Sequence, residues 1–310
     1  MKTVAIVNPL AGFRRTPGAW PTLLEQVGAE ASQVVTWWTK GPGHAEFLAG
    51  QAKKSGFERV IAVGGDGTAF EVVNGLWWEV EGRLPGLGIV PFGTGCDYVR
   101  NFDMGATRLD NLKNALGETT LNVDALVFHL VGWHQKAISR ISLNFLGSGL
   151  DARVIARHRR QKIPVPGKLS YFFHGFQELC RLKPFRLSGE IDGKPFKSLS
   201  NIIVLGLGRF FGGGMMITPS ASPQAGRCQV VWDQQLTRID LLKLIRKVYH
   251  GKHLFHPKVL NSLAQKVKIV VDPPGLVEAD GELIGWTPLE VEVCLQAFRV
   301  AAKKISFSTS

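Results

Sequence analysis

Hydrophobic and polar positions alternate regularly over the first third of the chain. Short apolar runs rich in β-branched residues are followed by segments with apolar residues at helical spacing. This pattern predicts strands at residues 3–7, 33–38, 60–64 and 86–90, and helices at 20–27, 44–55 and 68–76. Strands that alternate with helices predict a parallel sheet covered on both faces.

The pattern changes near residue 122. Most later segments read as strands, at residues 123–131, 137–145, 185–191, 200–205, 228–232, 267–271 and 289–294, and helices are predicted only at 169–181 and 238–250. A run of strands after an α/β unit predicts a second, antiparallel domain. We therefore expect an α/β domain of residues 1–122, rejoined by a strand in the tail 296–310, and a β domain of residues 123–295.

Three polar or glycine-rich corners follow predicted strands, with the sequences NPLAG, GGDGT and PFGTGCD. The carboxyl ends of parallel strands meet at one edge of a sheet, where ligands bind. Glycines let backbone N–H groups approach an anion, and the start of a helix adds positive charge. Asp66, inside GGDGT, is suited to hold magnesium against phosphates or to accept a proton. Thr68 and Glu71 also have the spacing of a capping box.

Composition and charge narrow the class of protein. The 310 residues are 45% hydrophobic, which indicates a globular chain, and neither a membrane-spanning run nor a signal peptide is recognisable, so we expect a cytoplasmic protein. The net charge of +12 attracts nucleic acid, anionic lipid or phosphorylated metabolites. The motif GxxxxGK[ST] of P-loop proteins and the GxGxxG fingerprint are both missing, so a nucleotide site would belong to another class.

The GGDGT corner resembles the signature shared by diacylglycerol kinases, sphingosine kinases and, more distantly, NAD kinases. Further segments resemble the lipid-kinase branch in its order: NPLAG, GGDGTAFEVVNGL, PFGTGCDYVRNF, FLGSGLDARV, GRFFGGGMMITPSA and ADGE. The resemblance implies an NAD-kinase-like α/β domain followed by an antiparallel β-sandwich for the lipid. It also implies transfer of the γ-phosphate of ATP, with Mg²⁺, to a hydroxyl of diacylglycerol, a sphingoid base or a related lipid.

The resemblance assigns roles to individual residues. Glu282 is implied as the proton acceptor, with Asp280 beside it, and Asp66 is implied in catalysis and as the magnesium ligand. The residues implied to bind the nucleotide are Asn8, Thr36, Gly64, Gly65, Asp66, Gly67, Thr68, Glu71, Thr94 and Asp97. By turn chemistry alone, the Asp280-Gly281 pair predicts a hairpin turn.

The basic segment RVIARHRRQK allows two interpretations. A charge run is commonly the solvated face of a helix, but beside apolar residues it also suits anionic lipid headgroups. The candidate headgroup contacts are Arg153, Arg157, Arg159, Arg160 and Lys162. A lipid kinase must reach its substrate in a bilayer, so we expect peripheral association with the inner face of the membrane. Nucleic acid is not an expected partner, because the basic residues lie beside apolar ones rather than on a base-stacking platform.

Four positions depart from the family pattern. Phe70, Cys96 and Leu207 stand where asparagines are usual, and Ala225 replaces an aspartate near a second magnesium site. Loss of that carboxylate predicts a weakened second site, because magnesium requires oxygen ligands. The departures leave open a weak or inactive regulator that binds lipid or nucleotide, and the shared GGDGT leaves open an NAD kinase. The sequence indicates no oligomeric state and does not identify the lipid.

Overall fold

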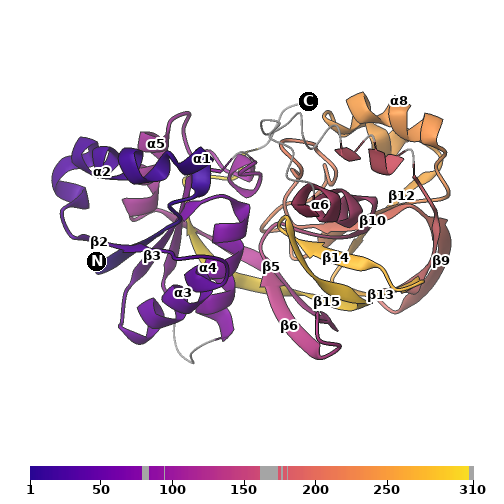
Figure 1. Ribbon diagram of the computed structural model, residues 1–310, viewed down its shortest axis with the longest axis horizontal. Helices are drawn as coiled ribbons and strands as arrows, with labels where there is room; N and C mark the ends of the chain where they lie inside the picture. The colour runs from indigo at the N-terminus through magenta and orange to yellow at the C-terminus, as the bar shows by residue number, and fades with distance from the viewer. Residues whose placement is uncertain (79–83, 94, 161–173, 176, 180, 307–310) are drawn as a thin grey trace. The chain divides into compact units, whose positions relative to one another are not determined.

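The computed structural model describes residues 1–78, 84–93, 95–160, 174–175, 177–179 and 181–306 (Figure 1). The chain divides into two compact units. Unit 1 comprises Met1–Ala125 and Leu295–Ser310, and unit 2 comprises Leu126–Cys294. Strands β5 (Thr120–Val131) and β15 (Glu282–Ala301) each begin in one unit and end in the other.

Unit 1 is built on a parallel sheet in the order β2-β1-β3-β4, to which the end of β15 adds beside β4. Its other strands are β1 (Thr3–Val7), β2 (Val34–Trp38), β3 (Arg59–Gly64) and β4 (Gly86–Pro91). Its helices are α1 (Ala11–Arg14), α2 (Thr16–Val27), η1 (Gly28–Ala31), α3 (His44–Lys54), α4 (Asp66–Trp78), η2 (Tyr98–Asn101) and α5 (Arg108–Leu116).

Both faces of this sheet are covered. In Figure 1, α2 and α5 lie on one face and α3 and α4 on the other. Every residue of β1 and β3 is buried, as expected for central strands of a covered parallel sheet. On the α2 and α5 side, the core joins Val7 and Val63 of the sheet to Trp20, Phe92 and Leu112. The carboxyl ends of the strands are thereby held in fixed register, and the three corners start from them.

Unit 2 is antiparallel. One run of paired strands has the order β12-β11-β10-β7-β14-β15, while β15 also pairs with β13, β13 with β8, β8 with β9, and β5 with β6. The strands are β6 (Ala137–Ser142), β7 (Phe145–Gly149), β8 (Phe185–Ile191), β9 (Lys194–Ser200), β10 (Ile202–Gly206), β11 (Cys228–Asp233), β12 (Val259–Ala264), β13 (Lys266–Asp272) and β14 (Leu276–Ala279). The helices with bounds inside the described ranges are α6 (Leu150–Arg160), α8 (Arg238–Val248) and η3 (Lys252–Phe255), and residues 174–175 and 177–179 are helical as well.

The predicted fold class, a parallel α/β region followed by an antiparallel β region, is confirmed. Some predicted elements were wrong in detail. The strand predicted at residues 137–145 is two strands, because β6 pairs with β5 whereas β7 pairs with β10 and β14. Strands β9, β12 and β14 were not predicted. The helix predicted at 169–181 lies largely outside the described residues.

Among the described residues, no helix is both long enough and apolar enough to cross a membrane.

Candidate active site

Backbone hydrogen bonds join the three corners of unit 1 at the carboxyl edge of its sheet. The N–H of Asn8 donates to the carbonyl of Val63 at 2.9 Å, and the N–H groups of Phe92 and Gly93 donate to the carbonyl of Gly64 at 2.7 and 3.1 Å. The corners that begin at Asn8, Gly64 and Pro91 are therefore one continuous rim. This is the position at which parallel α/β sheets bind ligands.

Asp66 is the first residue of α4, and backbone groups hold its carboxylate. The N–H groups of Asp97 and Tyr98 donate to it at 3.2 and 3.4 Å. Burial, and then the negative charge of Asp97, raise the pKa of Asp66 to about 6, against the effect of those N–H bonds. Asp97 is itself buried and pairs with Arg100 at 3.1 Å. The corner thus concentrates two carboxylates in a partly desolvated place.

This pair of carboxylates fits a magnesium ion. Magnesium in phosphate sites is commonly bound by one or two carboxylates together with phosphate oxygens and water. A cation beside Asp66 would offset the repulsion from Asp97 that raises its pKa. No group of three or more His, Cys, Asp or Glu side chains in the described part of the chain could hold a metal ion by itself.

Residues around Asp66 form a narrow turn with little side-chain volume. The Asn8 amide donates to the hydroxyl of Thr68 at 3.1 Å, and a Cβ added to Gly64 would clash with the Thr68 side chain. The N–H of Thr68 donates to the carbonyl of Gly65 at 3.1 Å, so the backbone from Gly64 through Gly67 curves directly into α4. A turn of this kind at a helix N-terminus is suited to bind phosphate.

The capping box predicted for Thr68 and Glu71 is wrong. The helix begins at Asp66, and Glu71 lies one turn inside it. Its carboxylate accepts hydrogen bonds from the N–H groups of Gly43 at 2.8 Å and Ala45 at 3.1 Å. These groups belong to the start of α3, so Glu71 caps a neighbouring helix instead of its own.

Thr36 was predicted at the end of the second strand, but it lies in the middle of β2, opposite Ala5. Its hydroxyl accepts a hydrogen bond from the Trp20 indole at 3.1 Å. The residue at the strand end is Thr39, which is buried and donates its N–H to the carbonyl of Val7 at 2.9 Å. Thr94 lies outside the described residues.

The hairpin turn predicted at Asp280-Gly281 is confirmed in unit 2. The turn joins β14 to β15, and both residues have positive φ angles, +47° and +84°. The Asp280 carboxylate accepts hydrogen bonds from the N–H of Phe145 at 2.8 Å and the hydroxyl of Ser142 at 2.9 Å. Asp280 therefore ties the hairpin to the β6–β7 connection.

Glu282 follows this turn and is held by a side chain. Its carboxylate, 39% exposed, forms an ion pair with Arg159 of α6, whose guanidinium also donates to the carbonyl of Gly281 at 3.4 Å. Arg157, on the same helix, is largely buried and pairs with Glu178. Arg153 donates to the carbonyl of Lys183 at 3.4 Å.

Two of the predicted headgroup residues are thus engaged by carboxylates of unit 2 itself, Arg157 by Glu178 and Arg159 by Glu282. Arg160 is exposed at the end of α6. Lys162 lies outside the described residues. The structure leaves the proposed headgroup role of this segment untested.

Two further carboxyl groups are buried in unit 2, close to the hairpin of β14 and β15. Asp151 of α6 and Glu278 of β14 both approach the space that a Cβ of Gly147 would take, so a glycine is required there. Burial raises the pKa of Asp151 to about 7, although the backbone N–H groups of Ala152 and of Asp151 itself oppose this. Burial, and then the charge of Asp151, raise the pKa of Glu278 well above its ordinary value. Glu278 also accepts a hydrogen bond from the N–H of Gly281 at 3.0 Å, next to Glu282.

Two family models cover the residues described above. The diacylglycerol kinase catalytic domain matches residues 2–128, and the YegS C-terminal NAD kinase beta sandwich-like domain matches residues 144–302. The chain belongs to the diacylglycerol kinase family. It is therefore a lipid kinase, and its second unit is the β-sandwich domain that the resemblance implied.

Curated relatives agree with this assignment. The chain is 27% identical to a diacylglycerol kinase of Staphylococcus haemolyticus over 93% of its own length and 86% of the relative's. It is 28% identical to a diacylglycerol kinase of Bacillus subtilis, over 94% of this chain and 93% of the relative.

Solved structures show the same fold. A diacylglycerol kinase from Bacillus anthracis superposes with a TM-score of 0.72 at 21% identity, over 97% of both chains. The yeast NADH kinase in complex with NADH has a TM-score of 0.56 at 13% identity, over 98% of this chain and 84% of that one.

The departures of this lipid kinase from the family pattern have different structural settings. Cys96 adopts a left-handed conformation with φ of +48°, which asparagine tolerates better than most residues. Burial, and then the charge of Asp66, raise the pKa of its thiol to about 12, so it stays protonated. Phe70 and Leu207 are buried and pack as core residues. Ala225 is exposed and offers no side-chain ligand for a second metal.

Proposed function

We propose that this lipid kinase transfers the γ-phosphate of ATP, with Mg²⁺, to the free hydroxyl of diacylglycerol. The observation that carries the proposal is the corner at Asp66, where a helix N-terminus, a glycine turn and two carboxylates meet at one edge of a parallel sheet. The names of the relatives favour diacylglycerol over a sphingoid base as the acceptor.

In this proposal the corner of unit 1 binds the nucleotide. Backbone N–H groups at the start of α4 receive the phosphates, and Asp66 and Asp97 hold magnesium. Bound magnesium supplies positive charge that neutralises the transferring phosphate. The hydrogen bonds from Asp97 and Tyr98 fix the Asp66 carboxylate before any ligand arrives, so little reorganisation is needed on binding.

Glu282 of unit 2 accepts the proton of the lipid hydroxyl. Its carboxylate is partly exposed, which allows contact with a substrate, and Arg159 holds it in one orientation. A base contributes modestly to phosphoryl transfer, because positioning and charge neutralisation supply most of the acceleration. Asp280, whose two oxygens bind Phe145 and Ser142, supports the turn that carries Glu282.

The association with the membrane is part of the same proposal. Diacylglycerol resides in a bilayer, so the kinase must bind its surface at least transiently, and we propose peripheral contact at the cytoplasmic face. The likeness to yeast NADH kinase concerns the fold alone and supports no second function.

A phosphorylation screen with labelled ATP tests the proposal. The purified chain is incubated with Mg²⁺ and mixed micelles that contain diacylglycerol, a sphingoid base or neither lipid, and with NAD in a separate reaction. We expect label in phosphatidic acid. Label in a sphingoid base phosphate would correct the substrate, while formation of NADP without any lipid product would overturn the proposal.

A further inference from the structure

Helix α8 of unit 2 presents apolar side chains on its outer face. Ile239 is 63% exposed, Leu242 46% and Tyr249, just past the helix end, 46%. Ile245 is exposed as well, so apolar residues recur every three or four positions along one side of the helix. Phe255, on η3, which packs against α8, is 85% exposed. Such clustering of large apolar side chains at a surface indicates an interaction site.

Other apolar side chains of α8, separate from those exposed ones, attach the helix to the core of unit 2. Leu244 is buried, and with the partly buried Leu241 it packs on a core formed by Phe145, Val204 and Val231. The apolar surface of the helix is therefore wider than the part that packs on the core, and the remainder of it is exposed. The fold of unit 2 accounts only for the part that packs on the core.

Basic side chains share this face of the helix with the apolar ones, since helical spacing puts Arg246 between Leu242 and Ile239 and puts Lys243 beside Ile239. Arg238, Lys243, Arg246 and Lys247 are all exposed on α8, and within the described residues none of them forms an ion pair. Asp240, the acidic residue of the helix, is withdrawn from this surface by its own contacts. The outer face of α8 is thus a mixed surface of apolar and positively charged side chains.

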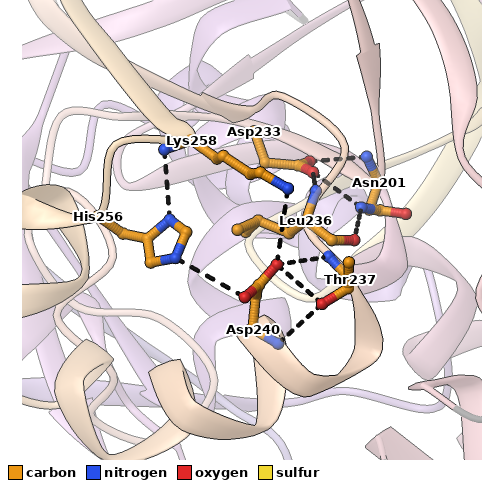
Figure 2. Close-up of polar contacts among 7 residues, drawn as sticks. All are labelled: Asn201, Asp233, Leu236, Thr237, Asp240, His256 and Lys258. Atoms are coloured by element: carbon orange, nitrogen blue, oxygen red, sulfur yellow. Dashed lines mark hydrogen bonds and ion pairs between the residues drawn. The ribbon is translucent and has the colours of Figure 1, made fainter.

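Polar contacts surround the first turn of α8, as Figure 2 shows. Thr237 and Asp240 form a capping box at its first turn, and Asp240 also lies 3.9 Å from His256 and from Lys258, just beyond η3. The buried Asp233 accepts hydrogen bonds from Leu236 and Asn201, both at 2.8 Å, in the segment that leads into the helix. These contacts join the first turn of α8 to the segment after η3.

Resting on the membrane association in the proposed function, we propose that the outer face of α8, defined by Ile239, Leu242, Lys243, Ile245, Arg246 and Tyr249, docks this protein on anionic membranes. Apolar side chains enter the interface between headgroups and acyl chains, while the basic side chains between and beside them bind lipid phosphates. Charge decides between this partner and a second copy of the chain. A two-fold dimer through the same face would bring the basic residues against their own copies, whereas an anionic bilayer complements them. This surface is distinct from the α6 segment, where Arg157 and Arg159 already pair with carboxylates.

Sedimentation with vesicles tests the docking surface without requiring catalysis. The full chain is mixed with vesicles of phosphatidylcholine alone, or of phosphatidylcholine with phosphatidylserine, in the absence of ATP and diacylglycerol. We expect binding to the anionic vesicles that weakens as salt is raised. Lys243→Gln with Arg246→Gln should reduce the partition coefficient by about five-fold for each charge removed. Leu242→Ser with Ile245→Ser should reduce it by at least about ten-fold.

Matched controls come from other exposed positions of unit 2. Lys194→Gln with Lys197→Gln removes the same charge from β9, and Leu263→Ser with Val270→Ser removes exposed apolar groups from β12 and β13. We expect these variants to bind like the unaltered chain, and all variants to keep its melting temperature and its kinase activity on short-chain diacylglycerol in micelles. Equal losses in the control and α8 variants would overturn the proposal. Light scattering that shows a dimer dissociated by the α8 substitutions would also overturn it, in favour of self-association.

Discussion

The carboxylates assigned to catalysis, Asp66 in unit 1 and Glu282 in unit 2, are held by different means. Asp66 starts a helix and accepts hydrogen bonds from two backbone N–H groups of a neighbouring corner. Glu282 follows a hairpin turn and is oriented by the side chain of Arg159. The position of the Asp66 carboxylate therefore depends on the backbone that follows two neighbouring strands. The position of the Glu282 carboxylate depends on one long side chain of α6.

The two carboxylates should therefore respond differently to substitutions of the residues around them. Substitutions other than proline leave backbone N–H donors in place, so the Asp66 geometry should survive most changes around it. The Glu282 geometry should respond to substitution of Arg159, because a guanidinium on a long side chain is its orienting partner. The turn before Glu282 has a second support, because the N–H of Gly281 donates to the carboxyl group of the buried Glu278. The pKa of that carboxyl group is raised.

Asp66→Asn should have the largest effect on activity. The amide keeps the size of the side chain but removes the charge for magnesium and places an NH₂ group against backbone donors. We expect kcat/KM for lipid phosphorylation to fall by about 10³-fold. Asp103→Asn, an exposed carboxylate of unit 1, serves as the control and should change little. Equal labelling by the Asp66 variant would remove that residue from the mechanism.

Glu282→Gln should lower kcat by about 10²-fold, the usual contribution of a general base. Nucleotide affinity should stay the same, since the corner that we assign to ATP is in unit 1. Binding of a fluorescent ATP analogue and turnover, measured on the same preparation, separate the two effects. A rise in the dissociation constant for ATP with unchanged kcat would contradict the assigned role.

Asp151→Asn should change how stability depends on pH. The pKa of Asp151 is raised to about 7 from 3.8, so between these values the folded protein binds a proton that the unfolded chain has lost. Stability therefore falls as pH rises through this window, by on the order of 1 kcal/mol per pH unit, and levels off above it. The variant should have a flatter profile and a higher melting temperature than the unaltered chain at pH 8. Asp272→Asn, at an exposed position, should leave the profile as it is.

Arg159→Gln should lower kcat by about ten-fold, because Glu282 loses the group that orients it while keeping its own chemistry. Arg160→Gln is a matched control on the next, exposed residue of the same helix. Arg159→Lys should recover only part of the rate, since an ammonium does not reproduce the fork of a guanidinium. Identical rates for the two glutamine variants would show that Arg159 has no positioning role.

Glu71→Ala should cost about 1 kcal/mol of stability, as expected for the loss of a helix cap, because the first N–H groups of α3 lose their acceptor. The KM for ATP should change by less than about two-fold. Thermal unfolding and initial rates check the two halves of this prediction. A large rise in KM with unchanged stability would restore the nucleotide-binding role that the family resemblance implied for Glu71.

Sequence alone determined the features that depend on neighbouring residues. The alternation of short apolar runs with segments of helical spacing predicted the sheet of unit 1, because a strand that is buried on both faces is a continuous apolar run. The GGDGT turn and the Asp280-Gly281 hairpin could also be predicted, since glycine and positive φ angles are local requirements. Strand β15 was predicted only in part, because Gly285 and Pro288 interrupt its sequence pattern. In the structure, pairing with β14 and β13 keeps the strand continuous across these two residues.

Tertiary structure decided which partner each polar side chain found. Glu71 caps α3, Asp280 binds Phe145, and Glu282 pairs with Arg159, across sequence separations of 28, 135 and 123 residues. No local pattern encodes such pairs, because they depend on how the strands and helices pack within each unit. The same holds for α8, whose periodicity predicts a helix but does not tell which part of its wide apolar surface enters the core. The local sequence therefore determined the chemistry available at each corner, and packing decided which groups remained free to use it.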